Sequence, residues 1–289
     1  MTGFRLIRIL CIAVLAISLL PQAADAGKRG PITEKIVFIP HDSRPISNKQ
    51  TADVVQRVGY EVVAPPMELL GNREDWGHPD ELWTWLEESL ARPGVKAAVI
   101  SSDAVIYGSL VGSRKHSFTR AQVLERAARF DALQKSYPKI PLYVFGSIMR
   151  TPRSGEASGH EEPEYYRRYG ADIFRYTLLR DKEEVEGLTR RERKEYDFLG
   201  RLIPKEALAD WMGRREKNYA VNEYLIDLMR RRGTFRYLTL GRDDNAPFSQ
   251  THMESRHLTE AGADLGKTRF QTMAGIDEIA LLMLTRAVN

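Results

Sequence analysis

The sequence predicts an α/β protein built on a mainly parallel sheet. Short apolar runs rich in Val, Ile and aromatic residues recur along the chain, each followed by loop residues and then by a segment with helical periodicity. The apolar runs are continuous rather than alternating, which is typical of parallel strands that are buried on both faces. The repeated order of strand and helix predicts that helices cover both sides of the sheet.

The expected strands lie near 35–40, 60–64, 96–101, 141–147, 235–240 and 269–274. The expected helices lie near 47–58, 79–91 and 119–136, as a long pair between 163 and 231, and near 252–264 and 276–287. These β/α units fit an open doubly wound sheet, and they also fit a partial or elaborated β/α barrel. Segment 151–170 is rich in Gly, Ser, Glu and Tyr, which indicates either a loop over the site or a long surface connection.

The first 26 residues are typical of a secretory signal peptide. Arg5 and Arg8 precede the apolar run "ILCIAVLAISLL", and Ala24-Asp25-Ala26 matches an A-x-A cleavage site. The run is shorter than the ~20 residues that cross a bilayer, so we expect no stable membrane span after cleavage, with an uncleaved anchor as the alternative. We therefore expect a secreted or periplasmic protein with a single α/β domain over 27–289.

Composition excludes several classes of function. The only cysteine, Cys11, lies in the apolar run of the expected signal peptide, which excludes disulfide and thiolate chemistry from the mature chain. The net charge is +4, but several basic residues lie in or beside the signal peptide, so the rest of the chain is close to neutral. A nucleic-acid partner is therefore not expected.

Charged and other polar residues follow five of the six expected strands. Because the carboxyl ends of parallel strands meet at one edge, these residues predict one site there. A single Asp in such a position could instead cap the next helix, and Arg44 could clamp a loop. In strand order the residues are Asp42 and Arg44; Asp103, Tyr107 and Arg114; Arg150; Asp243 and Asp244; and Asp277 and Glu278.

A further polar group is expected on a helix. Arg215, Asn218 and Asn222 are spaced three and four residues apart, so they share one helix face. Asparagine is a poor helix former, which predicts that these amides bond something specific. We expect them to point into the site and donate hydrogen bonds to a ligand; an ordinary surface helix is the alternative.

Six segments follow one another along the chain: "HDSRP" at 41–45, "SSDAVIYGSLVGSR" at 101–114, "SIMR" at 147–150, "REKNYAVN" at 215–222, "GRDDNAP" at 241–247 and "GIDE" at 275–278. In this order they resemble DUF4127, a bacterial family of unknown function. The chain departs from the family pattern at Ser43, Ser109, Lys217 and Ile276, where the family has Asp, Gly, Arg and Ala. The resemblance implies no activity, so function must be argued from the site.

Paired carboxylates together with arginines and amides favour a carbohydrate-active hydrolase acting on a small-molecule or oligosaccharide ligand. We expect Glu278 to be the general acid, with Asp244 and Asp103 as the other catalytic carboxylates. An exported solute-binding protein is one alternative. The other is a metal-dependent hydrolase in which Asp42, Asp103, Asp243 and Asp244 hold a divalent metal, the only cofactor left open. His41, His252 and His257 lie near enough in sequence to contribute. The expected substrate-binding residues are Asp42, Arg44, Tyr107, Arg114, Arg150, Arg215, Asn218, Asn222, Asp243 and Asp277.

Overall fold

The computed structural model describes residues 34–155 and 159–289. The expected signal peptide lies outside the described residues. Within the described ranges, no helix is both long enough and apolar enough to cross a membrane.

The described residues form one open sheet of six parallel strands. The strands are β1 (Lys35–Ile39), β2 (Glu61–Val63), β3 (Val95–Ser101), β4 (Leu142–Ile148), β5 (Tyr237–Arg242) and β6 (Phe270–Ala274). Their order is β2-β1-β3-β4-β5-β6, and every neighbouring pair is parallel. Because β2 and β6 are edges that do not pair with each other, the doubly wound prediction is confirmed and the barrel alternative is excluded.

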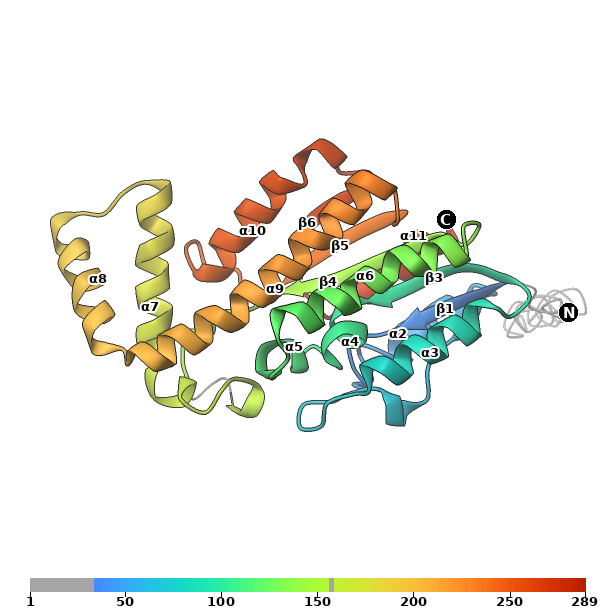
Figure 1. Ribbon diagram of the computed structural model, residues 1–289, viewed down its shortest axis with the longest axis horizontal. Coiled ribbons are helices and arrows are strands. Elements are labelled where there is room, and N and C mark those ends of the chain that lie inside the picture. Colours follow the sequence, from blue (N-terminus) through green and yellow to red (C-terminus); the bar gives the residue numbers. More distant parts are fainter. Residues whose placement is uncertain (1–33, 156–158) are drawn as a thin grey trace, which may run out of the picture. The chain divides into compact units, whose positions relative to one another are not determined.

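Helices cover both faces of this sheet, as Figure 1 shows. One face carries α3 (Pro79–Leu90), α6 (Arg120–Ser136), α9 (Lys205–Arg232) and α10 (Gln250–Ala261), and the other carries α2 (Lys49–Arg57) and α11 (Ile279–Val288). Successive strand residues point to opposite faces. In β1, Val37 packs in the first apolar core and Phe38 in the second, and both are fully buried. This double burial explains why the strand sequences are continuously apolar.

The segment between 163 and 231 contains three described helices, so the expected pair is corrected. They are α7 (Tyr166–Val185), α8 (Arg190–Leu202) and α9. Gly187 has a φ of +82°, which interrupts the helical path, and Thr189 then starts α8 by a capping box with Glu192. Pro204 separates α8 from α9. The pair α7–α8 packs on the start of α9 around its own apolar cluster, which includes Tyr166, Leu199 and Trp211.

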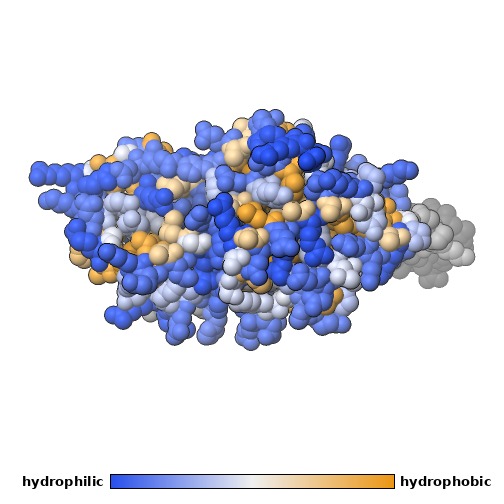
Figure 2. All heavy atoms as spheres, viewed as in Figure 1, coloured by the Kyte–Doolittle hydropathy of each residue, from blue (hydrophilic) through white to orange (hydrophobic). Residues whose placement is uncertain are grey.

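Two short helices, α4 (Ser102–Tyr107) and α5 (Gly112–Lys115), follow β3 and were not expected. Ser101 caps α4, because its Oγ accepts a hydrogen bond from the Ala104 N–H at 3.3 Å. Gly146 of β4 lets this helix start lie against the sheet, since a Cβ there would be 2.2 Å from Ser102 Oγ. The surface shown in Figure 2 is mainly hydrophilic, with apolar residues in scattered groups.

Candidate functional site

The strand order reverses between β1 and β3, and ligands of open α/β sheets bind beyond the carboxyl ends of the strands near such a point. A cavity of about 550 Å³ lies at this edge. It is bounded by residues that follow β1, β4, β5 and β6, by α5, and by the segments 73–74 and 160–161. Its described lining residues are Arg44, Arg73, Glu74, Leu110, Val111, Arg114, Arg150, His160, Glu161, Asp243, Ile276 and Asp277.

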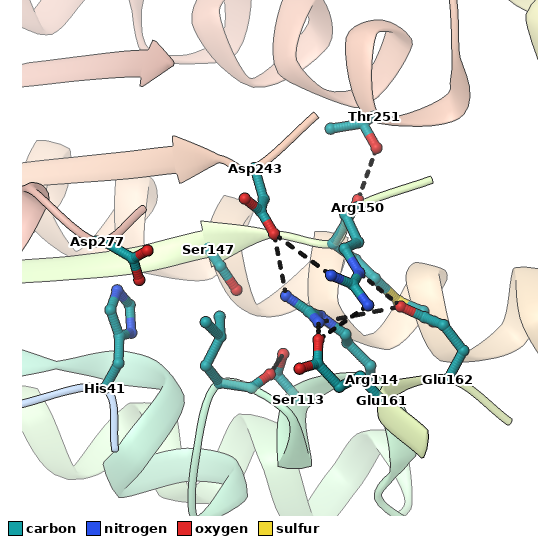
Figure 3. A network of polar contacts seen from close by, with 12 residues as sticks. His41, Ser113, Arg114, Ser147, Arg150, Glu161, Glu162, Asp243, Thr251 and Asp277 are labelled. Carbon is teal, nitrogen blue, oxygen red and sulfur yellow. Dashed lines mark hydrogen bonds and ion pairs between the residues drawn. The ribbon is translucent and has the colours of Figure 1, made fainter. Parts of the chain in front are cut away.

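Arg114 and Arg150 form the centre of the polar network in Figure 3. Arg150 Nη2 is 2.9 Å from Glu161 Oε2, and Arg114 Nη1 donates to the same oxygen at 3.2 Å. Asp243 Oδ2 is 3.6 Å from Arg150 Nη1 and 3.7 Å from Arg114 Nη2. Arg150 Nε also donates to Glu162 Oε1 at 2.9 Å. Two guanidinium groups therefore share three carboxylates at the carboxyl edge of β4.

The pKa values of these two arginines are shifted in opposite directions. Burial, and then the neighbouring Arg150, lower the pKa of Arg114, whose side chain is only 3% exposed; nearby carboxylates oppose this effect. Burial would also lower the pKa of Arg150, but Glu162, Glu161 and Asp243 outweigh it and raise that pKa. Nearby carboxylates therefore compensate the burial of the Arg114 charge less fully than that of the Arg150 charge.

Arg44 connects the loop after β1 with the loop after β6. Its backbone N–H and its Nε donate to Asp42, with Nε 2.9 Å from Oδ2, and Asp42 is almost fully buried. Its Nη2 lies 3.3 Å from Asp277 Oδ1 in the cavity lining. Burial opposes the charge of Arg44, but Asp42 and then Asp277 raise its pKa above the usual value. Arg44 therefore clamps its own loop and also faces the cavity.

The two carboxylate doublets present their first members to the cavity. We expected Asp244 and Glu278 to face the site, but Asp243 and Asp277 line it. Asp244 turns back to its own loop, where Oδ1 accepts from the Ala246 N–H at 2.8 Å. Glu278 immediately precedes α11 and is exposed, and its carboxylate approaches the position that a Cβ on Gly275 would occupy. Successive residues in a turn diverge, so only one member of each doublet lines the cavity.

Asp103 belongs to a buried polar cluster rather than to the cavity lining. Ser147 Oγ donates to Asp103 Oδ1 at 3.0 Å, and His41 Nδ1 lies 3.1 Å from Asp103 Oδ2 and 2.9 Å from Ser101 Oγ. Tyr107 is also buried and stacks on His116; burial and then Asp103 raise its pKa well above the usual value. This cluster joins the ends of β1, β3 and β4 beside the switch point.

The polar residues of α9 bond the protein backbone. Asn218 Nδ2 donates to Ser113 O at 2.8 Å, and Asn222 Nδ2 donates to Ser147 O at 3.1 Å. Arg215 pairs with Glu254, with Nη2 2.7 Å from Oε2, and also donates to the carbonyls of Met149 and Arg150. All three α9 side chains are buried, and none lines the cavity at the carboxyl edge. The expectation that they point into the site is corrected: they hold α5 and the end of β4 in place.

Among the candidate metal ligands, His41 and Asp103 contact each other, and the others contact different partners. Asp243 faces arginines, while Asp42, Asp103 and Asp244 are engaged as described above. His252 pairs with Asp181 and His257 with Glu184, both on α7. Within residues 34–155 and 159–289, no group of three or more His, Cys, Asp or Glu side chains is arranged to hold a metal ion.

Glu161, Glu162 and Arg73 also belong to the site, although the strand-end pattern in the sequence does not predict them. Arg73 Nε lies 3.2 Å from Glu161 Oε1. Glu161 and Glu162 belong to segment 151–170, whose composition left open a loop over the site, and Glu161 ends the short 3₁₀ helix η2 (Gly159–Glu161). The acidic pair in "GHEEPEY" was the available signal, because buried arginines need carboxylate partners.

The fold and the cavity define an open doubly wound α/β protein with a guanidinium- and carboxylate-lined site at its carboxyl edge. The chain belongs to DUF4127, described as a protein of unknown function, whose family model matches residues 36–289. This confirms the resemblance found in the sequence. A search among curated proteins finds no match.

Proposed function

We propose that the cavity binds a hydroxylated ligand of the carbohydrate class. The observation that carries this proposal is the balance of the described lining, which combines four arginines with four carboxylates. A sugar hydroxyl both donates and accepts hydrogen bonds, so alternating cationic donors and anionic acceptors suit a ring with several hydroxyls. A lining of a single charge sign would instead favour a small ion of the opposite charge.

Asp243 and Asp277 support a hydrolase that acts on such a ligand. Both line the same cavity, and their side chains are 43% and 41% exposed, so each can reach a bound molecule. Glycoside hydrolysis uses two carboxyl groups that flank the scissile bond, one as general acid and the other as base or nucleophile. We therefore assign these two roles to Asp243 and Asp277 rather than to Asp244 and Glu278.

Export is part of this proposal. The basic start, apolar run and A-x-A site in residues 1–26 support secretion or a periplasmic location. Polysaccharides and their fragments are available to a protein outside the cytoplasm. A solute-binding protein would use the same cavity and location without turnover, and the experiment below separates the two functions.

The test is release of reducing ends from an oligosaccharide library by the wild type, Asp243→Asn and Asp277→Asn. Loss of a general acid or base should lower turnover by roughly 10²- to 10⁴-fold with binding retained. Asp244→Asn is the matched control, because it removes a charge from the same doublet but not from the cavity lining, and it should keep wild-type turnover.

Binding without turnover by the wild type would favour the solute-binding alternative. Full turnover in both Asp243→Asn and Asp277→Asn would place the catalytic groups elsewhere. The absence of any saccharide binding would contradict the proposal as a whole.

A further inference from the structure

One carboxylate of the cavity lining, Glu161, is held by three arginines. Its Oε2 lies 2.9 Å from Arg150 Nη2 and 3.2 Å from Arg114 Nη1, and its Oε1 lies 3.2 Å from Arg73 Nε. The Glu161 side chain is 20% exposed, and it lines the cavity. A single carboxylate thus occupies the space where three guanidinium groups converge.

Glu162, the neighbouring residue, differs from Glu161 in position and role. Its side chain is fully buried. Its Oε1 accepts a hydrogen bond from Arg150 Nε at 2.9 Å but lies 4.0 Å from Arg114 Nη1. Glu162 is therefore the interior counterion of Arg150 and is absent from the cavity lining. The closest carboxylate contact of Arg114 is Glu161, at 3.2 Å.

Arg114 needs an anion at this position. Its side chain is 3% exposed, and burial together with Arg150 lowers its pKa, so its charge is costly without a close carboxylate. Glu162 at 4.0 Å and Asp243 at 3.7 Å lie beyond hydrogen-bonding distance of Arg114, so neither supplies the hydrogen-bonded anion. Either Glu161 or a carboxylate carried by a ligand can meet this need.

We infer that Glu161 is an internal stand-in for a ligand carboxylate, and that Arg114 and Arg150 form a subsite for the acidic group of a uronic acid. This inference rests on the proposed carbohydrate function and names its substrate class. A planar carboxylate matches the fork of donors on a guanidinium group. Asp243 and Asp277 keep the catalytic roles assigned above, and Arg44 also lines the cavity, where it can bond a sugar hydroxyl.

The inference makes Glu161 a competitor of the ligand. Removing its charge while keeping its shape should therefore strengthen binding of an acidic sugar more than that of a neutral sugar. Glu74 offers a matched control, because it lines the same cavity and is exposed, and the ion pairs among the described residues do not include it. Glu74→Gln changes the cavity charge by the same amount without freeing an arginine.

The experiment is calorimetric titration of D-galacturonate and D-galactose into the wild type, Glu161→Gln and Glu74→Gln. Galacturonate affinity should rise by roughly tenfold in Glu161→Gln, about the size of one hydrogen bond to a charged group. The ratio of galacturonate affinity to galactose affinity should rise in Glu161→Gln and stay close to the wild-type ratio in Glu74→Gln, because the ion pairs of the arginines in the described lining include Glu161 but not Glu74. Glu161→Ala should repeat the gain if Glu161→Gln fails to fold.

Several results would overturn the inference. A fall in galacturonate affinity in Glu161→Gln would make Glu161 part of the binding surface, and an equal gain in Glu74→Gln would show only a general charge effect. Tighter binding of galactose 6-phosphate than of galacturonate to Glu161→Gln would assign the subsite to phosphate. Galactose binding without any response to Glu161→Gln would refute this inference alone, whereas the absence of binding by any sugar would refute the proposed function as well.

Discussion

The polar face of α9 and the lining of the cavity both consist of charged and polar side chains, but these side chains have different partners. Those on α9 hydrogen bond to the protein itself, whereas those of the lining face a cavity. On α9, Arg215 and Asn222 are buried and donate to backbone carbonyls of the neighbouring chain segments. In the cavity lining, Asp243 and Asp277 are more than 40% exposed and contact arginines at 3.3 Å or longer. Groups whose bonds are used within the protein support the fold, and groups that keep free bonding capacity beside a cavity are available to a ligand.

The largest expected effect on stability is that of Arg215→Met. This change leaves Glu254 without its charged partner in an almost fully buried position and frees two backbone carbonyls. Loss of one member of a buried ion pair costs about 3–5 kcal/mol of unfolding free energy. Urea unfolding should show this loss.

Arg231→Met is the matched control on the same helix. Arg231 is 73% exposed and pairs with Asp227 four residues earlier, a contact worth about 0.5 kcal/mol or less. Equal losses for Arg215→Met and Arg231→Met would mean that the buried pair does not support the fold as described.

A smaller effect is expected for Asn222→Ala. The amide donates to the carbonyl of Ser147 at the end of β4, and leaving this buried acceptor unpaired costs about 1–3 kcal/mol. Ligand affinity should be retained, because Asn222 is not part of the cavity lining. Unfolding curves and ligand titration on the same variant check both statements. Unchanged stability together with weakened ligand binding would mean that Asn222 donates a hydrogen bond to the ligand, as its spacing in the sequence predicted.

The smallest effect, over the window from pH 7 to pH 5.5, depends on pH and arises beside α9. His116 is buried between the rings of Tyr107 and Phe118, and burial, then Lys217 and Arg214, lower its pKa from 6.5 to about 3. Between these values the unfolded chain binds a proton that the folded protein does not. Stability should therefore fall as the pH falls from 6.5 towards 3, by up to about 1.4 kcal/mol per pH unit.

His116→Leu isolates this contribution from that of the carboxylates. Chemical unfolding of the wild type and the variant should be compared between pH 7 and pH 5.5, above the usual carboxylate pKa values. The wild type should lose more stability than His116→Leu over this window. Parallel curves would show that His116 binds a proton in the folded protein as readily as in the unfolded chain.

The strands were predictable from sequence because they depend on local pattern, and the gathering of charged residues at one edge was predictable because it follows from parallel strands. Continuous apolar runs such as "KIVFI" predict buried parallel strands, and the geometry of parallel sheets brings the strand ends together. The break between α7 and α8 was also encoded locally, in Gly187 and in the capping box of Thr189 and Glu192. Helical periodicity continues on both sides of this break, so apolar spacing alone does not reveal it.

The bonding partners were not predictable from sequence. Spacing placed Arg215, Asn218 and Asn222 on one helix face, but whether that face meets a ligand or the backbone depends on how α9 packs against β4 and α5. Which member of each doublet faces the cavity depends on the turn geometry after β5 and β6. The partnership of Glu161 with Arg114 joins residues 47 positions apart, which no local pattern specifies.

The central claim is that the cavity at the carboxyl edge of the sheet holds a sugar. The most direct test is a crystal structure of Asp277→Asn soaked with mixed neutral and acidic oligosaccharides, since this variant should bind without turnover. We expect a sugar ring in the cavity, with hydroxyls within hydrogen-bonding distance of Asp243 and Arg44. A sugar bound only elsewhere, such as in the groove between α7, α9 and α10 lined by Arg180, Tyr219 and Gln250, would contradict the claim.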